Sequence, residues 1–146
     1  MYSQLEQYFL DAYSEPEYPT LRLQREKWIT SKPFAGLSIL DATPMCRNSI
    51  YKYMNLIYGG ARLSVGRTDI SSVDERLCEL LYGAGIAVVT PQQNEGEYDI
   101  IMDCAAQFLD TKARLGRVEL TRSGSESYRQ RNEAVYMADG GKIKLI

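Results

Sequence analysis

The sequence contains no histidine, and this absence removes several kinds of catalytic site at once. Histidine is the usual general base near neutral pH, the usual partner of serine and cysteine nucleophiles, and a very common zinc ligand. The cysteines are three in number, widely spaced and without a C-x-x-C pair, so we expect neither a disulfide framework nor a zinc knuckle. The sequence therefore predicts no metal site.

Long apolar runs and an excess of one charge are missing as well. No run approaches the ~18 apolar residues that span a bilayer, and residues 1–11 lack the basic start of a secretory signal. The net charge is −2 and Lys and Arg are spread along the chain, so neither nucleic acid nor a membrane is an expected partner. With 146 residues, of which 45% are hydrophobic, we expect one globular, cytoplasmic domain spanning residues 1–146.

The first 35 residues have the pattern of two helices that precede the main part of the domain. Apolar residues at helical spacing, among them Leu5 and Phe9, predict a helix over residues 2–13, and the prolines that follow end it. A second helix is predicted over residues 20–30, before the Ser-Lys-Pro segment at 31–33.

From residue 36 to residue 146, short apolar runs alternate with helical patterns. Alternation of this kind predicts an α/β fold with a three-layer, Rossmann-like open sheet that is mostly parallel and has helices on both faces. The last two strands, joined by Asp139-Gly140-Gly141, are predicted to form an antiparallel pair. The predicted strands are 37–42, 61–65, 86–90, 99–103, 117–121, 134–138 and 142–146, and the predicted helices are 43–58, 71–82 and a short one ending at 108.

Polar residues follow most of the predicted strands. Ligands of open α/β sheets bind beyond the carboxyl ends of the strands, near the point where the strand order reverses. We therefore expect a pocket for a small polar metabolite at this rim. Asp41, Asp103 and Thr121 have an alternative explanation, because such residues also cap helices and turns. The candidate ligand-binding residues are Asp41, Thr43, Asp69, Asp103, Cys104, Thr121, Arg122 and Ser123.

Two other features do not lead to a predicted site. The glycines at 83 and 85 resemble part of a dinucleotide-binding loop, but they precede a strand, so a helix C-cap is the better interpretation and no cofactor is predicted. Cys46 is placed in the first turn of the predicted helix 43–58, where the helix dipole lowers the pKa of a thiol, yet no histidine is present to act as its base.

Several segments resemble the substrate-binding domain of the S-adenosylhomocysteine hydrolase family, and the similarity covers residues 19–139. In that family the corresponding segments include Arg-Glu-Lys-Tyr, Ser-Lys-Pro-Leu-Lys-Gly, Ala-Gly-Ile-Pro-Val and Glu-Glu-Thr-Thr-Thr-Gly. The resemblance implies an α/β domain that binds a nucleoside-type ligand and associates into oligomers. The segments that carry it are 19–28, 31–36, 60–63, 84–88, 99–103 and 119–124.

The positions at which the sequence differs from the family pattern include residues that the family uses for its chemistry. Pro44, Cys46 and Asn48 stand where the family has His, Thr and Glu. Cys104 replaces the second of the family's paired aspartates, which the resemblance makes the catalytic one, and Leu120 replaces a glutamate. The hydrolase oxidises a ribose hydroxyl with NAD and then needs a base to remove a proton. We therefore expect binding of a metabolite without hydrolase activity.

Two alternatives remain open at this point. The eleven tyrosines are suited to the interface of an accessory or scaffold subunit, since tyrosine is enriched at interfaces, although half-buried aromatics are also ordinary in single domains. A diverged enzyme using Asp103, Cys104 or Arg122 with a separate cofactor protein is the other alternative. We expect a homo-oligomer or a partner protein in either case.

Overall fold

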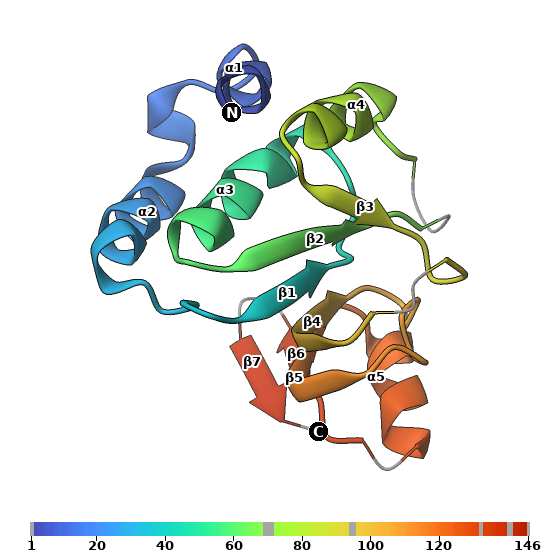
Figure 1. The fold of residues 1–146 in the computed structure, drawn as a ribbon. Helices are drawn as coiled ribbons and strands as arrows, with labels where there is room; N and C mark the ends of the chain where they lie inside the picture. Colours follow the sequence, from blue (N-terminus) through green and yellow to red (C-terminus); the bar gives the residue numbers. More distant parts are fainter. Residues whose placement is uncertain (1, 69–71, 94–95, 132, 140–141, 146) are drawn as a thin grey trace.

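The computed structural model describes residues 2–68, 72–93, 96–131, 133–139 and 142–145, and these contain five α-helices and seven strands (Figure 1). Two short 3-10 helices, Glu15–Glu17 and Arg47–Ser49, join longer elements. The helices are α1 (Ser3–Leu10), α2 (Pro19–Ser31), α3 (Ile50–Tyr58), α4 (Glu75–Gly83) and α5 (Arg122–Gln130). The strands are β1 (Ser38–Asp41), β2 (Arg62–Gly66), β3 (Ala87–Val89), β4 (Tyr98–Asp103), β5 (Ala113–Glu119), β6 (Tyr136–Asp139) and β7 (Lys142–Leu145).

The strands form one open sheet in the order β3-β2-β1-β4-β5-β6-β7. Neighbours from β3 to β6 are parallel, so the predicted α/β fold with an open parallel sheet is confirmed. Strand β7 pairs with β6 in antiparallel register at the edge. The strand order reverses between β1 and β4, which are neighbours in the sheet although β2 and β3 lie between them in the chain.

The helices lie on both sides of this sheet (Figure 1). Successive residues of β1 point to opposite faces: Ile39 packs with Leu56 of α3, whereas Leu40 packs with Phe108 of the loop after β4. Helices α1 to α4 gather over the β1–β3 half on the first face, and α5 lies against β5 on the second. Each half of the sheet therefore has its helices on a different side.

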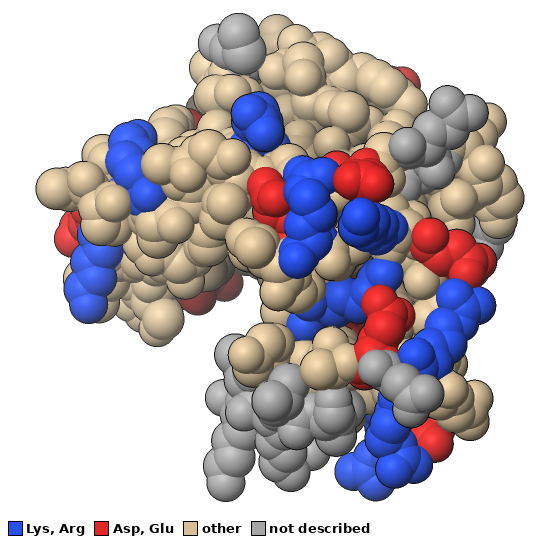
Figure 2. Space-filling model, turned by 60° about the horizontal axis from the view of Figure 1, so that its bottom comes forward, with Lys and Arg blue, Asp and Glu red and all other residues tan. Residues whose placement is uncertain are grey.

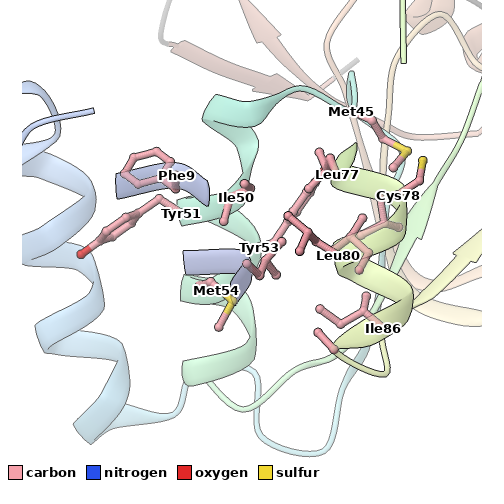
Figure 3. Packing of buried hydrophobic residues seen from close by; sticks show 14 residues of the cluster. Phe9, Met45, Ile50, Tyr51, Tyr53, Met54, Leu77, Cys78, Leu80 and Ile86 are labelled. Atoms are coloured by element: carbon pink, nitrogen blue, oxygen red, sulfur yellow. The ribbon is translucent and has the colours of Figure 1, made fainter. Parts of the chain in front are cut away.

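The larger hydrophobic core lies between α1, α3, α4 and the sheet (Figure 3). Ile50, Tyr53 and Met54 of α3 are fully buried at spacings of three and four residues, the spacing of one helical face. Phe9 of α1 and Leu77 of α4 pack into the same cluster from the neighbouring helices. This packing holds the start of α3 in place, and so positions the segment that joins the end of β1, at the rim of the sheet, to this helix.

The segment after β1 differs from its prediction. The predicted helix 43–58 begins only at Ile50, and residues 43–46 lie outside any helix. The carboxylate of Asp41 accepts the backbone N–H of Thr43, which turns the chain away from a helical path before α3 starts. Cys46 is consequently extended, with φ −134°, so its prediction in a first helical turn is wrong.

The segments around β4 and β5 also differ. The short helix predicted to end at residue 108 is a series of turns in which Ala105 and Ala106 have left-handed φ values of 57° and 51°. Strand β5 begins at Ala113 and ends at Glu119, earlier at both ends than the predicted strand 117–121. Helix α5 was not predicted, because its sequence Arg-Ser-Gly-Ser-Glu-Ser-Tyr-Arg-Gln is very polar.

The surface charges are interspersed. On the face drawn in Figure 2, basic and acidic side chains lie beside one another. Arg114 pairs with Asp99 at 2.9 Å, and Arg131 pairs with Asp110 at 2.7 Å. These charges neutralise each other locally. None of the helices in the described ranges combines the length and the apolar character needed to cross a membrane.

Candidate functional site

The rim at the carboxyl ends of β1 to β6 is the place where this fold can form a ligand crevice. The chain leaves β1 toward α3 on one face and leaves β4 into the Cys104–Thr111 loop, which packs on the other. Departure of two neighbouring strands in opposite directions opens a crevice between them. The predicted site residues are distributed around this rim.

Asp41 and Thr43 form a buried cluster with Lys52, the third residue of α3. Asp41 is completely buried, and its Oδ1 accepts hydrogen bonds from the backbone N–H of Thr43 at 3.0 Å and from its hydroxyl at 2.6 Å. Oδ2 accepts no hydrogen bond from a described residue and has the Lys52 ammonium 2.9 Å away. The same ammonium donates to the Thr43 hydroxyl. The side chain of Lys52 is 28% exposed, so this lysine links the cluster to the surface.

Asp103, at the end of β4, is buried and organises the loop that follows it. Its Oδ1 accepts the backbone N–H groups of Cys104 at 2.8 Å and Gln107 at 3.2 Å. Its Oδ2 accepts the backbone N–H of Phe108 at 3.0 Å and the hydroxyl of Tyr128. Burial, followed by the charge and hydrogen bond of Asp103, raises the pKa of the Tyr128 hydroxyl well above its ordinary value. The carboxylate is thus fully engaged within the protein.

Glu119, at the end of β5, is a second fully buried carboxylate with the same kind of role. Its Oε1 accepts the backbone N–H of Ala105 at 2.8 Å and both the N–H and the hydroxyl of Thr121 at 2.9 Å. Its Oε2 accepts the N–H of Ala106 at 3.1 Å. These bonds hold two alanines in a left-handed conformation that is unfavourable for them. Glu119 was not a predicted site residue, because the sequence placed it in the middle of the predicted strand 117–121, whereas β5 ends at Glu119.

The residues after β5 form the first turn of α5. Thr121 is the N-cap of this helix, and its hydroxyl accepts the N–H of Gly124 at 3.0 Å. The capping alternative for Thr121 is therefore what the structure shows. Arg122 and Ser123 are exposed on the first turn. Asp69, the remaining carboxylate of the predicted set, lies outside the described residues.

Cys104 is half-buried beside the two carboxylates. Burial and then the charges of Glu119 and Asp103 raise the pKa of its thiol. The thiol form of Cys104 therefore predominates at neutral pH, which is unfavourable for a nucleophile.

A small pocket of about 60 Å³ opens at the ends of β2, β3 and β4. Arg67 in its wall is held by Glu75 through two hydrogen bonds of 2.6 and 3.0 Å, so its charge is neutralised. The hydroxyl of Thr68, a nearly buried residue, makes no hydrogen bond to the described part of the chain. The predicted site did not include this pocket, although its residues also follow strand ends. It is lined by Arg67, Thr68, Thr90, Pro91, Gln92 and Gln107.

No protein-family model matches the chain, and a search of curated proteins likewise finds no match. Within the described residues there is no group of three or more cysteine, aspartate or glutamate side chains arranged to hold a metal ion. The rim offers hydroxyls, side-chain amides and neutralised cations, while the carboxylates of Asp41, Asp103 and Glu119 are engaged internally. An arrangement of this kind suits hydrogen bonding to a polar molecule better than proton transfer.

Proposed function

We propose that the chain binds a small, polar, nucleoside-type metabolite at the rim of the sheet and does not carry out the hydrolase reaction of the family that it resembles. The observation that carries this proposal is the pocket at the ends of β2, β3 and β4. It lies where ligands of open parallel sheets bind, next to the reversal of strand order. Its volume of about 60 Å³ is below the range for whole small-molecule sites, so it would hold one polar part of the ligand while the rest lies on the open rim.

The side chains around the pocket favour a neutral polar ligand. Thr68, Gln92 and Gln107 can both donate and accept hydrogen bonds, as recognition of ribose hydroxyls and base edges requires. Asp103 and Cys104 stand where the resemblance places the family's paired aspartates. Asp103 is occupied by four donors and Cys104 has a raised pKa, so neither residue is suited to remove a proton from carbon. These features support binding without the hydrolase cycle.

Calorimetry with adenosine and S-adenosylhomocysteine tests the proposal. We expect measurable binding of at least one of them, weakened about tenfold by Gln107→Ala, since one lost hydrogen bond is worth about 1.4 kcal/mol. Gln93→Ala is the control, because this exposed glutamine follows β3 and does not line the pocket, whereas Gln107 follows β4 and does. Absence of heat and of a thermal shift with both compounds would contradict the proposal.

A second candidate function is that of an interaction or accessory subunit, and the sheet face opposite α5 favours it. Arg117 and Glu119 point toward α5, so Val118 between them points to the other face, and Val118 is in register with Tyr136 of β6. Tyr136 is 47% exposed, and Leu120, just after β5, is 39% exposed. Exposed apolar residues that lie together are typical of protein interaction surfaces.

Sedimentation velocity of the purified chain tests this second candidate. If the face joins copies of the chain, we expect a species larger than the monomer that Tyr136→Glu returns to the monomer, because a buried, unpaired charge opposes association. Tyr82→Glu is the control, since Tyr82 is also exposed but belongs to α4. A wild-type monomer at all concentrations, with no stable partner, would argue against the interaction function.

A further inference from the structure

We propose that Lys52 contacts the ligand directly and that it recognises an uncharged oxygen, a hydroxyl or a carbonyl, in preference to a phosphate group. This inference rests on the proposed function and names a contact residue and a ligand class for the same rim. Lys52 was not a predicted site residue, and the segment that resembles the hydrolase family does not assign it a role.

The ammonium of Lys52 is held by two buried partners and donates one hydrogen bond to the described residues, so N–H groups remain for a ligand. It donates a hydrogen bond to the hydroxyl of Thr43 and forms an ion pair with Asp41, whose Oδ2 lies 2.9 Å from the ammonium nitrogen. Both partners are buried at the end of β1, the strand that lies between β2 and β4 in the sheet. A lysine that is already ordered loses little side-chain entropy when it binds a ligand, so its remaining N–H groups are efficient donors.

The charges around Lys52 determine which acceptor it prefers. Asp41 neutralises Lys52, and Glu75 neutralises Arg67 in the wall of the pocket at the ends of β2, β3 and β4. Two further buried carboxylates, Asp103 and Glu119, lie at the ends of β4 and β5 but on the opposite face of the sheet. A doubly charged phosphate would therefore find the charge of Lys52 already balanced by Asp41, whereas a hydroxyl or carbonyl needs only a directed donor.

A purely structural role, in which Lys52 only neutralises the buried Asp41, makes different predictions. In that case a ligand at the rim neither protects Lys52 from chemical modification nor depends on it for affinity. The single substitution Lys52→Met leaves Asp41 buried and unpaired and is expected to impair folding. The double variant Asp41→Asn/Lys52→Met removes both charges and avoids this problem.

Two measurements test the inference. The first is reductive methylation of the wild-type chain, with and without adenosine, read by mass spectrometry at Lys52 and at the exposed Lys27 of α2. We expect adenosine to slow methylation of Lys52 at least several-fold and to leave Lys27 unchanged. The second is calorimetry, in which we expect the double variant to bind adenosine at least tenfold more weakly than Lys27→Met, and wild type to bind adenosine monophosphate at least tenfold more weakly than adenosine.

The outcomes separate this inference from the proposed function. If the wild-type chain binds adenosine but Lys52 stays unprotected and the double variant binds equally well, the role of Lys52 is wrong while the proposed function stands. Tighter binding of adenosine monophosphate than of adenosine overturns the preference for an uncharged ligand. If neither adenosine nor S-adenosylhomocysteine binds, the proposed function fails, and the inference fails with it.

Discussion

Replacing Gly124 by alanine is expected to lower the free energy of unfolding by at least about 3 kcal/mol, because the added methyl group has no space. A Cβ atom at this position would lie 2.4 Å from Cδ of Glu119 and 2.6 Å from both of its carboxylate oxygens. Glu119 cannot move aside, since it is fully buried and its oxygens hold Ala105, Ala106 and Thr121. The clash therefore spreads into the loop after β4.

Gly124 lies within α5, so the expected loss of stability is opposite in sign to the usual effect of Gly→Ala in a helix. In an open helix, Gly→Ala stabilises by about 1 kcal/mol, so the substitution at Gly124 must reverse the sign of the ordinary effect. Gly83→Ala is the matched control: Gly83 is the last residue of α4, and a Cβ there meets nothing within 4 Å. Urea unfolding of the two variants measures the difference. If Gly124→Ala were as stable as the wild type, the close packing of α5 against Glu119 described here would be contradicted.

The substitution Glu119→Gln is expected to cost about 2–4 kcal/mol of stability, although it changes only one oxygen into an amide nitrogen. All the groups that face Glu119 in the described structure are donors, namely three backbone N–H groups and the Thr121 hydroxyl. The amide NH₂ of glutamine would point at one or more of these donors, and a buried donor would lose its acceptor. The left-handed turn at Ala105 and Ala106 would lose its main support.

Glu126→Gln is the control for this prediction. Glu126 lies on the exposed side of α5, where it pairs with Arg129 at 2.8 Å, three residues further along the helix. Exposed pairs of this kind contribute at most about 0.5 kcal/mol, so the control is expected to unfold almost as the wild type does. Chemical denaturation followed by circular dichroism compares the two variants. A loss no larger for Glu119→Gln than for Glu126→Gln would contradict the proposed anchoring role.

The parts of the fold that were predictable are those set by hydrophobic spacing. The short apolar run of β1, which is buried on both faces, and the apolar stripe of α4 can be seen directly in the sequence. Helix α5 was not predicted from the sequence, because polar contacts hold it in place. Tyr128 is a large buried side chain of this helix, Thr121 caps its start, and the small Gly124 lets the helix pack against Glu119. Patterns of apolar residues carry no signal for such an element.

The candidate site was predictable in its location and not in its contacts. The strand ends identified the rim, because in a parallel sheet they all lie on one edge. Which carboxylates are free to bind a ligand depends on partners that are distant in the sequence, such as the hydroxyl of Tyr128 for Asp103 and the ammonium of Lys52 for Asp41. The same residue types, aspartate and threonine, thus serve as internal anchors here rather than as exposed ligand contacts.

The central position of β1 also has a consequence for the order in which the chain folds. Strands β1 and β2 and helix α3 are close together in the chain and can associate with little loss of loop entropy. The pairing of β1 with β4 instead joins residues that are 61 positions apart, as in the bond between Ser38 and Asp99. Non-local parallel pairing of this kind slows folding. Until it forms, the chain exposes the edge of β1, and a truncated or slowly synthesised chain that stops before β4 would be prone to aggregate through this edge.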